Sequence, residues 1–163
     1  MTMFVATTLT SQTAYDKVDQ FDIAKDSWAK VKLNGKYGFI DKDGKEVVKP
    51  IYDDIGQFDI NHDGWAQVKL NGKCGFIDKN GNEIVKPTYD RIDQFDINLD
   101  GWAQVKLDGK FGFINMAGKE IVKTIYDEIG QFDIVRDGWA QVKIKKKISF
   151  IDKKGVDVLT TTN

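Results

Sequence analysis

The stretch Tyr52–Thr88, YDDIGQFDINHDGWAQVKLNGKCGFIDKNGNEIVKPT, decides the organisation of the chain, because closely similar sequences occur three more times. Tryptophan in W-A-x-V-K marks the register, and consecutive copies are 37 residues apart without insertion or deletion. Self-similarity at a fixed period is the signature of a repeat protein. We therefore expect a lead-in, 1–14, followed by one repeat domain, 15–162, with the repeats 15–51, 52–88, 89–125 and 126–162.

The composition suits a folded chain, with 41% hydrophobic and 30% charged residues. Each repeat is too small to bury a core alone and must pack against its neighbours. Lys plus Arg is 24 and Asp plus Glu is 25, a net charge of −1. Because nucleic acids and anionic membranes attract a clear basic excess, we expect neither as a partner.

Short runs rich in Val, Ile and aromatic residues, bounded by Asn, Asp and Gly, are typical of β-strands. No run shows the 3.6-residue period of a helix. Tyr52, Ile55 and Phe58 are three residues apart, which indicates either a single helical turn or a bulge. In the second repeat we predict strands over Ile55–Ile60, Trp65–Leu70, Lys73–Asp78 and Glu83–Lys86.

The central hairpin of the first repeat, VKLNGKYGF at 31–39, allows two registers. A two-residue Asn34-Gly35 turn would place Lys32 opposite Tyr37. A three-residue loop with a bulge would instead place Val31 opposite Tyr37 and collect the apolar side chains on one face. We expect the bulged register, because a slip of one residue moves every side chain to the other face of the sheet.

Glycine follows the aromatic slot of this hairpin at Gly38, Gly75 and Gly112. A glycine inside a strand marks a bend or the close approach of another backbone, and we expect that backbone to belong to the neighbouring repeat. The single cysteine, Cys74, occupies the slot held elsewhere by an aromatic or isoleucine residue, so we interpret it as a small hydrophobic residue.

The end repeats depart from the pattern. The fourth has Lys145-Lys146 in place of Asn-Gly and Ser149 in place of the strand glycine. Polar, atypical ends are what an open stack needs. The sequence therefore favours an all-β fold, an open stacked array of short antiparallel strands. A four-bladed propeller that closes its last blade with the segment 15–21 is the alternative.

The words GKYGFIDK at 35–42, GKCGFIDK at 72–79 and GKFGFI at 109–114 resemble the bacterial WG repeat, also called the KWG repeat. The flanking E-x-V-K-P and D-G-W-A-x-V agree as well, and the resemblance covers nearly all of 15–162. The tryptophan of the family's name is replaced by Tyr37, Cys74, Phe111 and Ile148. The resemblance implies an all-β repeat used for binding or scaffolding in bacterial proteins, and it implies no catalytic residues.

The motif D-x-N-x-D-G occurs twice and matches the first half of a calcium loop, in which oxygen ligands alternate and glycine turns the chain. The position of the closing bidentate glutamate is occupied by Leu70 or Leu107. A β-turn stabilised by Asp and Asn side chains explains the same residues. Calcium therefore remains a secondary hypothesis, with the candidate ligands Asp59, Asn61, Asp63, Asp96, Asn98 and Asp100.

Recurrent aromatic residues allow two readings. They form either an exposed ladder for a protein or carbohydrate partner, or the packing between repeats. Packing is favoured, because large aromatic side chains are usually buried. The candidate partner-binding residues are Trp28, Trp65, Trp102, Trp139, Tyr52, Tyr89 and Tyr126.

Catalysis has little support. His62 is the only histidine, and Leu99 replaces it in the next repeat. No triad or glycine-rich phosphate loop is recognisable. We expect a non-enzymatic module without a cofactor that acts in protein–protein interaction or scaffolding. Carbohydrate or cell-envelope binding and a calcium-stabilised propeller-like module are the alternatives. A cytoplasmic location is expected, because no charged signal sequence or membrane span is visible.

Overall fold

The computed structural model describes residues 14–20, 28–59, 64–96, 101–133 and 138–160. The chain divides into two compact units, Met1–Ile51 and Tyr52–Asn163. Every regular element in the described ranges is a β-strand. Over the same ranges, no helix long and apolar enough to cross a membrane occurs.

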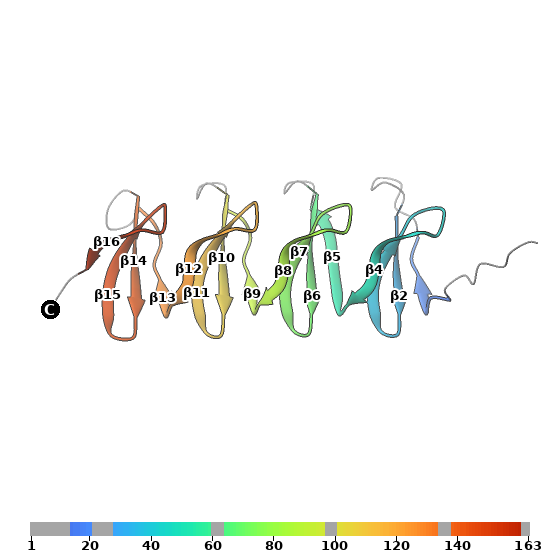
Figure 1. Cartoon of the computed structure of the whole chain (residues 1–163), viewed down its shortest axis with the longest axis horizontal. Helices are drawn as coiled ribbons and strands as arrows, with labels where there is room; N and C mark the ends of the chain where they lie inside the picture. Colours follow the sequence, from blue (N-terminus) through green and yellow to red (C-terminus); the bar gives the residue numbers. More distant parts are fainter. Residues whose placement is uncertain (1–13, 21–27, 60–63, 97–100, 134–137, 161–163) are drawn as a thin grey trace, which may run out of the picture. The chain divides into compact units, whose positions relative to one another are not determined.

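Four consecutive strands make each sheet, in the order of the sequence (Figure 1). The first sheet comprises β1 (Lys17–Val18), β2 (Ala29–Leu33), β3 (Lys36–Ile40) and β4 (Glu46–Tyr52). The second comprises β5 (Asp54–Asp59), β6 (Trp65–Leu70), β7 (Lys73–Ile77) and β8 (Glu83–Tyr89). The third comprises β9 (Arg91–Ile92), β10 (Trp102–Leu107), β11 (Lys110–Asn115) and β12 (Glu120–Tyr126). The fourth comprises β13 (Glu128–Ile129), β14 (Trp139–Ile144), β15 (Lys147–Asp152) and β16 (Asp157–Thr160).

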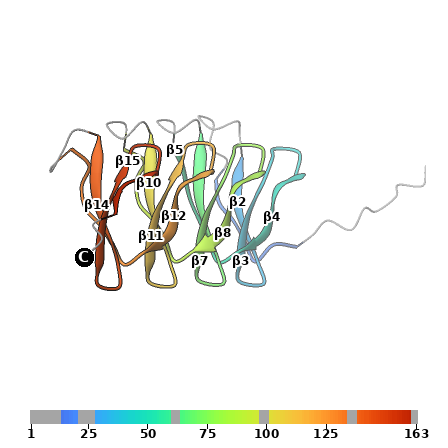
Figure 2. The ribbon, with the colours of Figure 1, turned by 60° about the vertical axis from the view of Figure 1, so that its left-hand side comes forward.

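The repeats form an open array. Within Tyr52–Asn163 the three sheets follow one another in chain order (Figure 2). The propeller alternative is wrong, because it requires the segment 15–21 to complete the last sheet. Instead β1 pairs with β2 of its own repeat, Lys17 opposite Lys32, and the last sheet is built from β13 to β16 alone.

The hairpin register differs from the expected bulged one. Lys32 pairs with Tyr37 and Val31 with Gly38, around a two-residue turn in which Asn34 and Gly35 have φ of 50° and 78°. Two successive positive φ values match the twist of the flanking strands. The expectation was wrong because both faces of the hairpin bury apolar groups. The ammonium nitrogen of Lys32 lies over the Tyr37 ring, 4.9 Å from its centroid, so that ring is partly covered on the lysine face of the hairpin.

Irregular pairing explains the strand glycines. A Cβ on Gly75 would lie 2.7 Å from the Pro87 nitrogen and 2.9 Å from the Lys86 carbonyl carbon of β8. The close approach is as expected, but the backbone belongs to the same repeat, not to the neighbouring one. The cause is that β7 and β8 shift register on both sides of Phe76, which folds β8 across the glycine. Between Ile55 and Phe58 the pairing also shifts, so the bulge is confirmed there over the helical turn.

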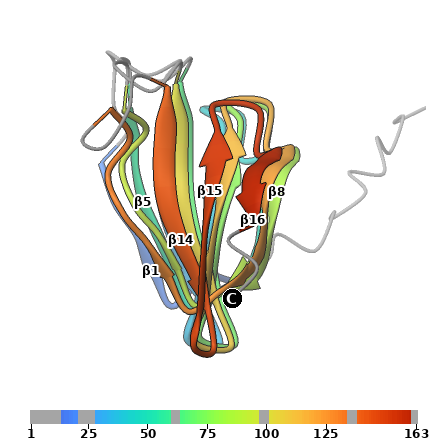
Figure 3. The same cartoon turned by 90° about the vertical axis from the view of Figure 1, so that its left-hand side faces the viewer.

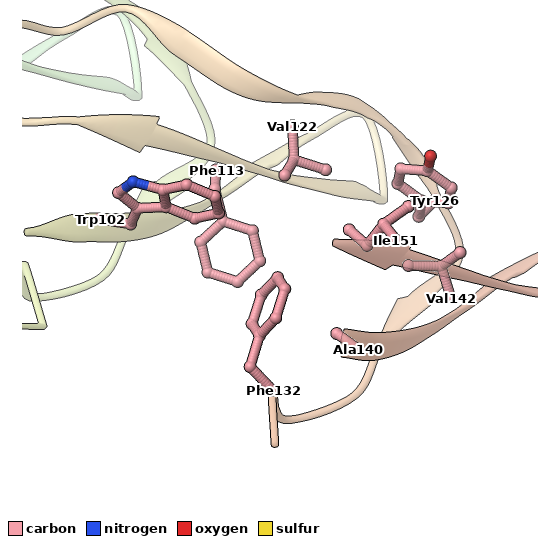
Figure 4. Packing of buried hydrophobic residues seen from close by; sticks show 8 residues of the cluster. All are labelled: Trp102, Phe113, Val122, Tyr126, Phe132, Ala140, Val142 and Ile151. Carbon is pink, nitrogen blue, oxygen red and sulfur yellow. The ribbon is translucent and has the colours of Figure 1, made fainter. Parts of the chain in front are cut away.

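Apolar layers between sheets hold the second unit together. Trp102 and Phe113 of the third sheet receive Phe132, whose ring meets that of Trp102 edge-on at 5.9 Å and 86° (Figure 4). The same arrangement joins Trp65 to Phe95 at 5.8 Å and 86°. The layer shown in Figure 4 comprises Trp102, Phe113, Val122, Tyr126, Phe132, Ala140, Val142 and Ile151.

The last hairpin offers a stabilising substitution. Lys145 adopts φ of 55° where the other hairpins carry Asn or Asp. Because Asn tolerates the left-handed region better than Lys, Lys145→Asn should raise the free energy of unfolding by about 0.5 kcal/mol. Thermal unfolding of the variant checks this, with exposed Lys154→Asn as the control. A variant less stable than the parent chain would contradict the turn assignment.

Candidate functional site

The tryptophan row is part of the core. Trp65 and Trp102 are only 9% and 7% exposed, while Trp28 and Trp139 are half-buried. Each ring packs on the phenylalanine of the paired strand, as Trp65 does on Phe76 at 5.9 Å. Trp65 and Trp102 therefore offer no open ring face to a ligand, and the packing interpretation holds for them.

The tyrosines of the row are packing residues, and Tyr52 contacts a residue near the end of its own repeat. Tyr52 is 3% exposed, and its hydroxyl donates to Glu83 Oε1 at 3.3 Å. Burial, reinforced by the charge of Glu83, raises the pKa of Tyr52 to about 12. Burial first and a nearby carboxylate second also raise the pKa of Tyr89 and of Tyr126. These residues act in packing, so the structure does not bring the predicted aromatic residues together as an exposed ladder.

A lysine and an aspartate link consecutive repeats. Lys73 Nζ lies 2.6 Å from Asp90 Oδ1, and the other oxygen of Asp90 accepts the backbone N–H of Asp108 in the hairpin turn. Lys110 pairs with Asp127 in the same way. One carboxylate thus fixes its own hairpin and holds the preceding repeat. The sequence alone did not single out this link, although the Lys-to-Asp separation of 17 residues is the same in both repeats.

These links predict a loss of stability in acid. The hydrogen bond from Lys73 and then the backbone N–H of Asp108 lower the pKa of Asp90 below its ordinary 3.8, and Lys110 has the same effect on the pKa of Asp127. Because the unfolded chain then binds more protons, the stabilisation is present above the ordinary pKa and disappears as the pH falls through the lower folded value.

We therefore expect the melting temperature to fall between about pH 5 and about pH 3, a window that brackets the ordinary aspartate pKa of 3.8. The melting temperature of a chain carrying both Asp90→Asn and Asp127→Asn should fall less over this window than that of the parent chain. The control Asp43→Asn, in an exposed turn, should show the same fall as the parent. Equal falls for the double variant and the control would rule out the carboxylate links as the cause.

The calcium motif is described only in part. Residues 60–63 and 97–100, and the Asp59 side chain, lie outside the described residues, and with them Asn61, Asp63, Asn98 and Asp100. Asp96 is exposed, and its backbone closes the loop: its N–H donates to Trp102 O and its carbonyl accepts from Gly101. The part of the chain that is described holds no group of three His, Cys, Asp or Glu able to bind a metal. Calcium binding stays a prediction, which melting with and without chelator tests.

A repeated surface lies on the last strand of each sheet, which forms one of the two edges of that sheet. In β8 and β12 every second or third side chain is exposed, and Ile125 is 45% exposed. We call this surface the outer-strand row; within the second unit it comprises Glu83, Lys86, Thr88, Glu120, Lys123 and Ile125. The sequence did not single it out, because its residues are ordinary for a strand edge.

Comparison with known proteins identifies the repeat. The model of the WG containing repeat family matches residues 37–74, 75–111 and 111–147 in succession. No curated protein matches the chain. The three matches run through the hairpins, the strand glycines and the interfaces described above, and together they cover most of the sequence. The chain belongs to the WG containing repeat family.

Proposed function

We propose that this chain is a non-catalytic module that binds a protein partner along the outer-strand row, as part of a scaffold in the bacterial cytoplasm. The observation that carries the proposal is the repetition of the row: Glu83 and Lys86 on β8 are matched by Glu120 and Lys123 on β12. A partner that binds one copy meets the same chemistry on the next. Repeated engagement of this kind strengthens binding without new types of contact.

The chemistry of the row favours recognition by side chains. Both strands lie at the edge of their sheets, but charged residues and Pro87 discourage the addition of another strand. An exposed Ile125 beside Lys123 supplies apolar area next to a charge, the combination found at the rims of protein interfaces. Burial of Trp65 and Trp102 leaves a carbohydrate ladder without the ring faces of two consecutive repeats.

The test is a charge reversal on the row. The purified chain is used to capture proteins from a bacterial lysate, and a captured partner is then purified and titrated by calorimetry. Lys86→Glu combined with Lys123→Glu should weaken binding about tenfold or more, since charge reversal leaves like charges facing each other. The control, Lys79→Glu with Lys119→Glu, makes the same charge change in exposed turns. Equal losses in both variants, or no saturable partner, would overturn the proposal.

A further inference from the structure

Inside the second unit, each sheet receives the opening segment of the next repeat through two shared contacts. A lysine pairs with the aspartate that follows the opening tyrosine: Lys73 with Asp90. Five residues later, a phenylalanine inserts edge-on against the tryptophan, as Phe95 does against Trp65. The next interface repeats both contacts, with Lys110 and Asp127 and with Trp102 and Phe132.

A further contact accompanies them at the first of these interfaces. The side chain of Gln67 donates to the backbone carbonyl of Ile92 at 3.5 Å. The received segment includes the short strand β9, which pairs with β10, and carries Asp, Ile and Phe at the spacing D-x-I-x-x-F, as in Asp90, Ile92 and Phe95. Charge, backbone and ring contacts together define what one sheet recognises in the next.

The last sheet carries the same receiving groups at the same register. Trp139 and Phe150 pair at 6.2 Å and 44°, close to the 5.9 Å and 48° of Trp65 and Phe76. Both rings are half-buried, and Lys147, the counterpart of Lys73 and Lys110, is exposed. Figure 3 views this end of the second unit, with β14, β15 and β16 nearest the reader. The receiving groups are thus already placed, and Trp139 and Lys147 are more exposed than their counterparts inside the array.

A cavity and an apolar surface extend this face. The cavity, of about 590 Å³, is lined by Glu128 to Gln131 of the β13 segment and by Gln141 and Lys143 of β14. Gln141 is the counterpart of Gln67, so the cavity lies where the backbone of an opening segment passes in the interior interface. Ile148, on the strand paired with β14, is 44% exposed and is flanked by the exposed lysines of the last hairpin.

We propose that the last sheet is a docking site for an extended segment of a partner protein that carries an acidic residue, an aliphatic residue and a phenylalanine at the spacing D-x-I-x-x-F. This rests on the proposed function and adds a place and a partner chemistry to it. Lys147 binds the carboxylate, Gln141 binds a backbone carbonyl, and Trp139 with Phe150 receives the phenylalanine. The basic hairpin, Lys145 to Lys147, favours acidic residues around the motif.

A second copy of the chain fits this face less well. In the interior, Val85 of one repeat packs with Ala103 and Val105 of the next. Their counterparts in the first repeat, Ala29 and Val31, are already 0% and 1% exposed, so they offer no apolar surface to the last sheet of another molecule. A face-to-face pair of last sheets would bring the lysine-rich hairpins together.

The experiment uses a labelled peptide with the sequence of residues 89–96, YDRIDQFD, and follows fluorescence anisotropy with the full chain. We expect saturable binding. Lys147→Glu should weaken it about tenfold or more, because an attractive charge pair becomes repulsive. The adjacent Lys146→Glu makes the same change in net charge and should weaken it much less. Replacing the peptide's phenylalanine with alanine should also abolish saturation.

A charge swap makes the test specific. A peptide with lysine in place of Asp90 should not bind the parent chain but should bind the Lys147→Glu chain. Absence of saturable binding, or equal losses for Lys147→Glu and Lys146→Glu, would overturn the docking site. Self-association in sedimentation velocity that Lys147→Glu removes would overturn it too, in favour of a second copy.

Failure here is distinguishable from failure of the proposed function. The chain with Lys86→Glu and Lys123→Glu should still bind the peptide, because neither lysine contacts the last sheet's receiving groups. If the peptide does not bind but a captured partner still depends on the outer-strand row, the docking site is wrong and the proposed function stands.

Discussion

Gly75→Ala should lower the free energy of unfolding by about 3 kcal/mol or more, one of the largest effects of any small substitution in this chain. The added methyl would lie 2.7 Å from the Pro87 nitrogen and 2.9 Å from the Lys86 carbonyl carbon. Both are backbone atoms, so no side-chain rotation relieves the contact. The backbone of Gly75 is not left-handed, so the loss measures the close approach of β8 alone.

The control is Gly130→Ala. A Cβ there would meet Gln141 O at 3.4 Å and nothing closer, and its φ is also not in the positive range. We expect a change within about 0.5 kcal/mol, as for ordinary surface substitutions. Urea unfolding of both variants, followed by circular dichroism, measures the difference. Similar values for the two variants would show that β8 does not fold across Gly75.

The natural Ser149 is consistent with this expectation. It occupies the glycine position in the last sheet, where Ser149 pairs with Thr160 and Phe150 with Leu159 without a register shift between them. In the second sheet the register shifts immediately after Cys74, beside the glycine. A side chain is therefore tolerated in the fourth repeat because the regular pairing leaves room for it, and Ser149 uses its hydroxyl to bind Asp157.

Trp102→Ala should lower the free energy of unfolding by about 3–5 kcal/mol, the usual range for removing a large buried aromatic ring. Trp102 is 7% exposed and packs with Phe113 of its own sheet and Phe132 of the next repeat, both at 5.9 Å. Because the ring belongs to an interface, the loss should reach beyond its own repeat. Hydrogen exchange should therefore quicken in β14 as well as in β10.

Trp139→Ala provides the matched comparison. The same residue type is removed from the same register position, but Trp139 is only half-buried. Trp139→Ala should lower the free energy of unfolding by less than Trp102→Ala does, and it should leave hydrogen exchange in β10 unchanged. If both variants lose equal stability, burial between the sheets is not what stabilises the tryptophan row.

Much of the fold was predictable because it depends on local chemistry. The fixed spacing of Trp65 and Trp102 set the repeats, and Val and Ile residues between Asn-Gly and Asp-Gly turns placed most strand ends of the second repeat within one residue of those observed. The exception is β8, which continues three residues beyond the predicted end at Lys86 to Tyr89. Among the predicted site residues, Trp65, Trp102, Tyr52 and Tyr126 are buried and pack in the core. The outer-strand row and Lys147 were not predicted, because an exposed lysine has no distinctive sequence signal.

The sequence by itself determined the all-β class, the four repeats and their hairpins, since turn chemistry and strand alternation act over a few residues. Only the tertiary structure decided the register, the strand that crosses Gly75, the burial of Trp65 and the pairing of Lys73 with Asp90. The physical reason is that each of these depends on which face of a strand meets the next strand or the next repeat. Both faces of the hairpin are partly apolar, so the alternation of residues could not choose between them.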